Sequence, residues 1–175
     1  MSEFTVLGIV AANSTPQPDL TLDGRPVGAF ADDADPPSPP GIYSAPWAEW
    51  PAFLLSLLGE EPSVEGSMLP GRIAVACCAS CGDASCGVLY GAELVRSERT
   101  VQWRNAQWEV ETDRPLPPPS TALARLARRA GFGATYEFTG WRPGIGRVRT
   151  VTFDREQYDA VIREALRALP DSPAP

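Results

Sequence analysis

The four cysteines of this 175-residue chain lie within a run of ten positions that begins at residue 77 and ends at residue 86. The run reads Cys-Cys-Ala-Ser-Cys-Gly-Asp-Ala-Ser-Cys. Sulfurs with this spacing can reach one point only if the chain reverses in a tight turn. A zinc knuckle and a dithiol redox centre both need such convergence. The sequence therefore predicts a thiol or metal centre carried by a short loop.

The segment before the turn, Arg-Ile-Ala-Val-Ala, leads into the first two cysteines and reads as a strand buried on both faces. Side chains alternate along a strand, so Cys77 and Cys78 should point to opposite faces. We therefore expect Cys78, Cys81 and Cys86 to form the cluster and Cys77 to be a core residue. Structural zinc normally has four ligands. The fourth ligand could be Asp83, water, or Cys77 if the strand ends early.

The cysteine spacing supports several kinds of centre. Zinc is the leading interpretation, ahead of reduced thiols that only pack, a redox dithiol and an iron–sulfur cluster. A redox dithiol usually opens a helix, whose dipole lowers a thiol pKa, whereas this turn leads into a strand. Asp83 is expected to accept backbone N–H bonds inside the turn, as in an Asx turn, in preference to binding metal.

The chain contains no histidine. This excludes a Ser-His-Asp triad, a Cys-His pair and any histidine metal ligand from the chain itself. The sequence also places no obvious catalytic acid beside the cysteines, which favours structural use of zinc over Lewis-acid catalysis. We therefore predict no catalytic residues.

The net charge of −7 weighs against several classes of partner. The 15 basic residues are all arginine and are dispersed, mainly over 96–104 and 125–149, without the concentrated basic face of a nucleic-acid binder. The N-terminus lacks the pattern of a signal peptide. No segment reaches the roughly 18 uninterrupted apolar residues of a membrane span. We expect a cytoplasmic protein with a protein partner and with neither nucleic-acid nor membrane binding.

A chain of this length can bury one good core, so we predict a single domain over residues 1–170 and a disordered tail at 171–175. Residues 31–41 combine aspartate and proline without an apolar anchor, which predicts an exposed, mobile loop. Hydrophobic periodicity predicts an α+β fold with a mainly antiparallel sheet of about six to eight strands and two or three helices packed on it. The expected strands are 4–10, 19–23, 72–78, 88–96, 100–104, 107–111, 134–138 and 147–153.

Three helices are expected. The first runs from Trp47 to Leu58, with both tryptophans of its apolar stripe favoured as core residues over pocket residues. The second is short and carries Leu123 and Leu126 after a proline-rich break. The third closes the domain and begins at an N-cap aspartate.

The start of that last helix has a detailed signature. Asp154 is the expected N-cap and Gln157 its capping-box partner. Phe153 and Tyr158 are spaced as a hydrophobic staple.

Parts of the chain resemble a group of uncharacterised small proteins from GC-rich bacteria. The resemblance rests on the turn Cys81-Gly-Asp-Ala-Ser-Cys86-Gly, on the strand pair that closes at Val101-Gln-Trp103, and on the helix opening Phe153-Asp-Arg-Glu-Gln-Tyr158. Proteins of the group carry a Cys-Gly-Asp-x-x-Cys-Gly-type turn before a strand that ends in tryptophan. The resemblance implies a shared domain and no particular reaction. This chain differs in its adjacent cysteine pair and its acidic, proline-rich loop.

Two functions follow as hypotheses. The first is a non-enzymatic α+β domain, stapled by the cysteine turn, that binds another protein as an immunity or regulatory protein; its acidic charge would steer it to a basic partner. The second is an enzyme that uses a cysteine-bound metal or a reactive thiol.

Overall fold

The structure, a computed structural model, describes residues 4–11, 18–32, 43–63, 69, 71–83, 85–117, 119–130, 136–144 and 146–169. The strands are β1 (Leu7–Ala11), β2 (Pro18–Leu22), β3 (Arg25–Pro26), β4 (Tyr43–Ser44), β5 (Arg72–Cys78), β6 (Val88–Arg96), β7 (Thr100–Pro115), β8 (Tyr136–Pro143) and β9 (Arg149–Asp154). The helices are α1 (Val27–Ala31), α2 (Trp50–Leu58), α3 (Ala122–Arg129) and α4 (Arg155–Arg167). The predicted tail, and the predicted loop beyond residue 32, lie outside the described residues.

The strands form two sheets in which every pair is antiparallel. The larger sheet has the order β4-β5-β6-β7-β8, with β9 also paired to β7, and the smaller sheet has the order β1-β2-β3. These pairings confirm the predicted α+β fold with a mainly antiparallel sheet. β1 and β2 form an N-terminal hairpin. None of the described helices has the length and apolar character needed to traverse a bilayer.

β7 is the strand on which the larger sheet is built. One edge of its 16 residues pairs with β6, while the other edge pairs first with β9 and then with β8. The register shifts between Trp103 and Ala106, and Asn105 has a φ of 50°. A bulge of this kind bends a strand without ending it. The predicted segments 100–104 and 107–111 are therefore two halves of one strand.

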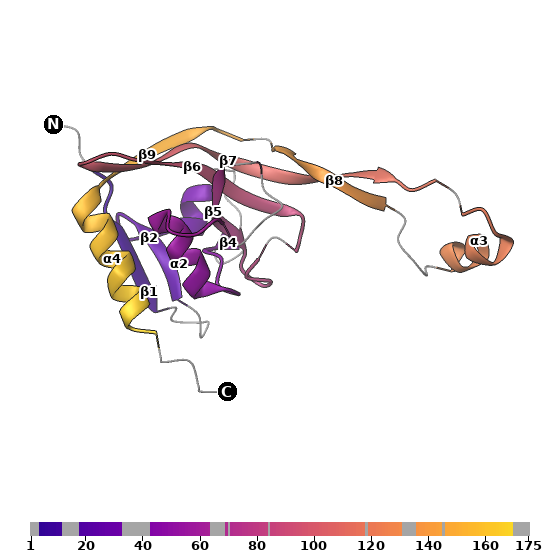
Figure 1. Ribbon diagram of the computed structural model, residues 1–175, viewed down its shortest axis with the longest axis horizontal. Coiled ribbons are helices and arrows are strands. Elements are labelled where there is room, and N and C mark those ends of the chain that lie inside the picture. The colour runs from indigo at the N-terminus through magenta and orange to yellow at the C-terminus, as the bar shows by residue number, and fades with distance from the viewer. Residues whose placement is uncertain are drawn as a thin grey trace.

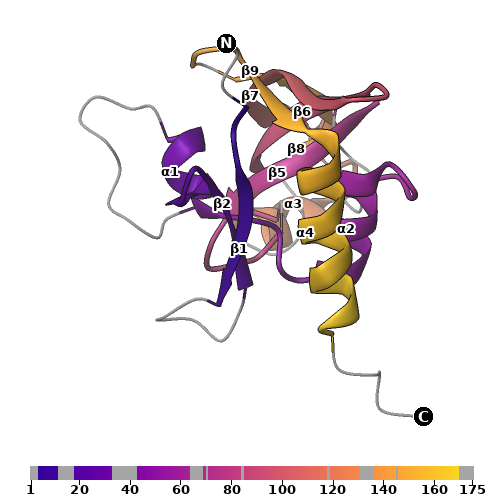
Figure 2. The same ribbon diagram turned by 90° about the vertical axis from the view of Figure 1, so that its left-hand side faces the viewer.

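Apart from the β7–β8 ribbon and α3, the described elements form one body. Its core lies where α2 and α4 pack side by side against the sheets (Figures 1 and 2). Trp103 of β7 and Tyr158 of α4 are fully buried there. The indole Nε1 of Trp103 donates to the Tyr158 hydroxyl at 3.0 Å, and that hydroxyl donates to the carbonyl of Leu57 at 3.2 Å. Burial raises the pKa of Tyr158. One hydroxyl thus connects β7, α4 and α2.

α2 begins at Trp50, three residues after the predicted start at Trp47. Proline lacks a backbone N–H and is tolerated only in the first turn of a helix. Pro51 occupies that first turn, with Glu49 as the N-cap, so the proline sets where the helix begins. The helix ends at Gly59, whose φ of 72° is the left-handed conformation common at helix C-termini. Trp47 is left outside the helix.

The start of α4 confirms two of its three predicted features. The Asp154 side chain accepts a hydrogen bond from the backbone N–H of Gln157 at 3.0 Å, and the rings of Phe153 and Tyr158 lie 5.0 Å apart. The reciprocal capping-box bond was wrongly predicted. The Gln157 side chain instead donates to the Leu7 carbonyl at 2.6 Å and accepts from the Leu7 N–H at 3.3 Å. This side chain therefore ties α4 to β1.

The second half of β7 leaves the body. Val110 is its last residue paired with β6, and from there β7 and β8 continue as a two-stranded ribbon that projects away, with α3 near its far end (Figure 1). Although the short helix was predicted, it does not pack on the sheet: α3 makes no extensive contact with any other described helix or strand. Its Leu123 and Leu126 side chains are 78% and 65% exposed.

Candidate metal centre

The cysteine turn connects β5 to β6. The carbonyl of Cys78, the last residue of β5, accepts a hydrogen bond from the Gly82 N–H at 2.9 Å, which reverses the chain. The Asp83 carboxylate then accepts from the Ser85 N–H at 2.8 Å. This is the predicted Asx turn. Two successive turns thus bring the chain back toward the sheet.

The turn brings together the three cysteines that strand alternation singled out. The sulfurs of Cys78, Cys81 and Cys86 all lie within 4.8 Å of one another, and those of Cys81 and Cys86 are 3.1 Å apart. Tetrahedral zinc with bonds of about 2.3 Å separates its sulfur ligands by about 3.8 Å. Small adjustments would therefore let all three bind one ion. Cys86 is exposed and the other two are half-buried, so the centre faces solvent.

The thiols of this trio differ in acidity. A hydrogen bond from the backbone N–H of Cys81 is the main cause that lowers the pKa of Cys78. The hydrogen bond between the Cys86 thiol and the Cys81 sulfur, with a smaller contribution from Cys78, raises the pKa of Cys86 to about 12. Losing the Cys86 proton would break the hydrogen bond that this thiol donates. A cation bound to all three sulfurs would replace thiol protons and offset most of the thiolate charge.

Two residues considered for the fourth position lie outside the trio. Cys77 is fully buried in the core, and its sulfur contacts the carbonyl of Cys78 at 3.7 Å. β5 continues through Cys78, so the early strand end that would turn Cys77 toward the cluster does not occur. The carboxylate of Asp83 is engaged by the turn itself. Within the described residues, the group able to hold an ion consists of the three cysteines alone.

Trp47 holds the turn in place, a role that the sequence did not predict. Its indole Nε1 donates to the Ala79 carbonyl at 3.1 Å, and the backbone N–H groups of Trp47 and Ala48 donate to the Gly82 carbonyl at 3.1 and 3.2 Å. The indole also covers Gly82, where a Cβ atom would come within 2.4 Å of the ring. The available signal was the position of Pro51, which excludes Trp47 from the helix and leaves its ring free to pack elsewhere.

Glu111 of β7 lies beside the end of the turn. Its backbone N–H donates to the Gly87 carbonyl at 2.8 Å. Its carboxylate Oε2 lies 2.9 Å from the place that a Cβ atom on Gly87 would occupy. Gly87 has a φ of 71°, so both its conformation and its neighbour favour glycine. Glu111 thus adds an exposed acid beside Gly87, the residue that follows Cys86, a placement that depends on how β6 pairs with β7.

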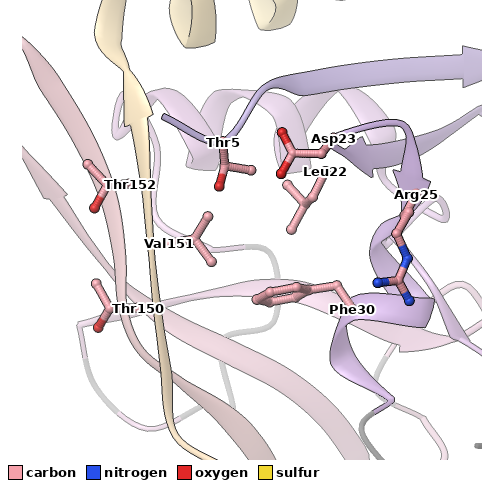
Figure 3. A pocket seen from close by; sticks show the side chains of 8 residues that line it. All are labelled: Thr5, Leu22, Asp23, Arg25, Phe30, Thr150, Val151 and Thr152. Carbon is pink, nitrogen blue, oxygen red and sulfur yellow. The ribbon is translucent and has the colours of Figure 1, made fainter. Parts of the chain in front are cut away.

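A separate cavity of about 350 Å³ opens between the N-terminal hairpin and β9 (Figure 3). Its lining includes the hydroxyls of Thr5, Thr150 and Thr152, and the ring of Phe30 lies across from Thr150. The carboxylate of Asp23, also in the lining, accepts the Val6 N–H at 2.8 Å and so braces the hairpin. None of the cysteines lines this cavity. The candidate chemistry of the described residues therefore lies at the cysteine turn.

No protein-family model, curated protein or solved structure matches this chain, so its candidate function rests on the geometry of the cysteine turn.

Proposed function

We propose that this chain is a non-enzymatic, protein-binding domain of the immunity or regulatory kind, in which the cysteine turn holds a structural zinc ion. The observation that carries the proposal is the convergence of the Cys78, Cys81 and Cys86 sulfurs within 4.8 Å on one short loop. The proposal includes a domain shared with the small-protein group whose cysteine turn this chain resembles.

The surroundings of the trio support a structural role. The turn is held from outside by the Trp47 indole and from inside by the Asp83 carboxylate. An ion bound to the three sulfurs would join the last residue of β5 to the residues just before β6 through metal–sulfur bonds. Such a bond network stabilises the folded chain because the unfolded chain has no preformed site. Zinc fits best because thiolates select soft or borderline ions and no redox partner is required.

An enzyme that uses the same cysteines is the second candidate. The exposed Cys86 sulfur and the neighbouring Glu111 favour it, because an ion with three protein ligands keeps an open position. A carboxylate near that position is a general base candidate. We rank the enzyme second. The turns at Gly82 and Asp83 direct the three sulfurs toward one another, whereas the neighbouring acid, Glu111, lies on β7 outside the cysteine turn.

The binding proposal rests on charge. The chain carries a net charge of −7. A surplus of this size raises the association rate with a basic protein and is screened by salt. A basic toxin or regulator is therefore the class of partner that suits this protein best.

Elemental analysis and a thiol count on the purified protein test the zinc staple. We expect about one zinc per chain in the wild type, and we expect Cys86→Ser to lose zinc and about 2 to 5 kcal/mol of unfolding free energy. Cys77→Ala is the matched control, because it removes a buried sulfur outside the trio and should keep the zinc. Apparent zinc affinity should fall as the pH falls, since protons compete for a Cys86 thiol whose pKa is about 12.

The outcomes separate the two candidates. The structural zinc role is supported if Cys86→Ser loses zinc and unfolds more easily while Cys77→Ala keeps its zinc. A wild-type protein without metal and with four reactive thiols contradicts it. Turnover of a small substrate that disappears in Cys86→Ser while the melting temperature is unchanged would support the enzyme instead.

A further inference from the structure

The ribbon formed by β7 and β8 has two unlike faces. Tyr136 and Phe138 are 55% and 47% exposed on one face, where the ring of Trp141 packs at 6.4 Å from that of Phe138. On the other face, Arg114 and Glu137 form an ion pair at 2.8 Å. The indole N–H of Trp141 is buried and has no acceptor among the described residues. The exposed rings of Tyr136 and Phe138 leave apolar area on this face that another surface could cover.

The ribbon also has two open edges. Past Val110, β7 no longer pairs with β6, and β8 pairs only with β7 in the described part of the sheet. A two-stranded ribbon is marginally stable alone in water, and its unpaired N–H and C=O groups can pair with another strand. A partner that covers the aromatic face or pairs with an edge would stabilise the ribbon.

Charge is divided unequally between the ribbon region and the rest of the chain. From Glu111 to Pro143, the ribbon with α3, there are five arginines and three acidic residues, a net charge of +2. The remaining positions hold ten arginines and 19 acidic residues, a net charge of −9. The sequence of α3 itself contains three arginines and no acid, while its Leu123 and Leu126 are exposed. A basic, partly apolar tip thus stands away from an acidic body.

We propose that two copies of this chain form a two-fold symmetric dimer in which the ribbons lie antiparallel, so that each α3 docks on the acidic body of the other copy. A two-fold interface uses the same patch on both chains and closes without further growth. The antiparallel arrangement covers both aromatic faces at once. It also brings each basic tip to the acidic surface of the partner, which is charge complementarity supplied by a single sequence.

A second copy suits these features better than a lipid surface. α3 has only eight residues and two leucines, which is little apolar area for an interfacial helix. An anionic membrane would repel the rest of the chain, which has a net charge of −9. Open strand edges also need hydrogen-bonding partners that hydrocarbon does not offer.

Sedimentation velocity of the full chain at low and high micromolar concentration tests the dimer. The wild type should sediment at twice the chain mass of 18.8 kDa, and added salt should weaken the association. Leu123→Ser with Leu126→Ser, and separately Arg125→Glu with Arg129→Glu, should each raise the dimer dissociation constant about tenfold or more. Val10→Ser replaces an apolar residue that is 43% exposed on β1, away from the ribbon, and should leave the dimer unchanged.

Near-ultraviolet circular dichroism and zinc content should be the same in all these variants, which separates loss of the dimer from loss of the fold or of the staple. A wild type that remains monomeric at every concentration overturns the proposal. So do leucine variants that dimerise as tightly as Val10→Ser. A monomer that instead co-sediments with phosphatidylglycerol vesicles through α3 would overturn it in favour of a membrane partner.

Discussion

At the scale of single residues, Gly82 decides whether the cysteine turn can close under Trp47. Its φ of 73° is a conformation that other residues rarely adopt, and the indole occupies the space that a Cβ atom would need. The turn therefore depends on the absence of a side chain at one position. The cysteines supply the sulfurs, but Gly82 and Trp47 set where they point.

Gly24 is a matched control for a substitution at Gly82. Gly24 has a similar φ of 77°, but nothing lies within 4 Å of the place for a Cβ atom. Gly24→Ala should lower the unfolding free energy by about 1 kcal/mol from backbone strain alone. Gly82→Ala must also displace the Trp47 indole, so it should lower the unfolding free energy by about 3 kcal/mol or more and weaken zinc binding. Urea denaturation measures both; equal losses would show that Trp47 does not clamp the turn.

At the scale of the elements, a buried ion pair connects three strands. Arg72 of β5 donates to Glu109 of β7, and its Nη2 also donates to the carbonyls of Gly91 and Asn105, both at 2.7 Å. The other carboxylate oxygen of Glu109 accepts from the Leu69 N–H at 3.1 Å. Removing Arg72 would leave the buried Glu109 carboxylate without its counter-ion, and removing Glu109 would leave Arg72 only the half-exposed Glu93 at 3.6 Å. The pair therefore holds β5, β6 and β7 in one arrangement.

A double-mutant cycle tests this connection. Arg72→Met or Glu109→Leu alone should lower the unfolding free energy by about 3 to 5 kcal/mol, and the double variant should lose less than the sum. Arg163→Met is the control, because its partner Glu60 at 2.6 Å and its own side chain are both about half exposed, and such pairs contribute about 1 kcal/mol or less. Additive losses in the cycle would show that the two charges do not stabilise each other.

At the scale of the whole molecule, the division of charge would let two parts of this chain bind two different surfaces. The acidic body suits a basic protein partner, while the basic ribbon and α3 suit the acidic body of a second copy. Salt should weaken both contacts.

Capture from a cell lysate by immobilised wild type, followed by reconstitution with the purified partner, tests the binding role. We expect a basic protein whose association rate falls with added salt, because steering depends on unscreened charge. Glu60→Gln with Glu61→Gln, on the exposed residues after α2, should slow association if that surface contributes. A partner that binds at the same rate at low and high salt would contradict electrostatic steering.

Much of the fold was predictable because it depends on local patterns. A continuous apolar run predicted β5, and side-chain alternation along it separated Cys77 from Cys78. The spacing of Asp154, Phe153 and Tyr158 predicted the start of α4. These signals act over a few residues and need no knowledge of neighbouring strands. Their consequences hold in the structure.

Contacts between distant segments were not predictable in the same way. Gln157 turns away from its own helix start because Leu7, 150 positions earlier, offers both a donor and an acceptor. Arg72 opens an apolar strand with no local sign that Glu109 lies opposite. Such pairs depend on which strands become neighbours, and a one-dimensional pattern does not contain that information.

Which three sulfurs can converge follows from the order of residues alone, because a tight turn between two strands leaves Cys78, Cys81 and Cys86 on one side and Cys77 on the other. That Trp47 covers this turn, and that α3 stands at the end of a ribbon away from the body, depends on how distant segments pack. Helix and strand signals act over a few residues, whereas burial depends on which other segments lie alongside.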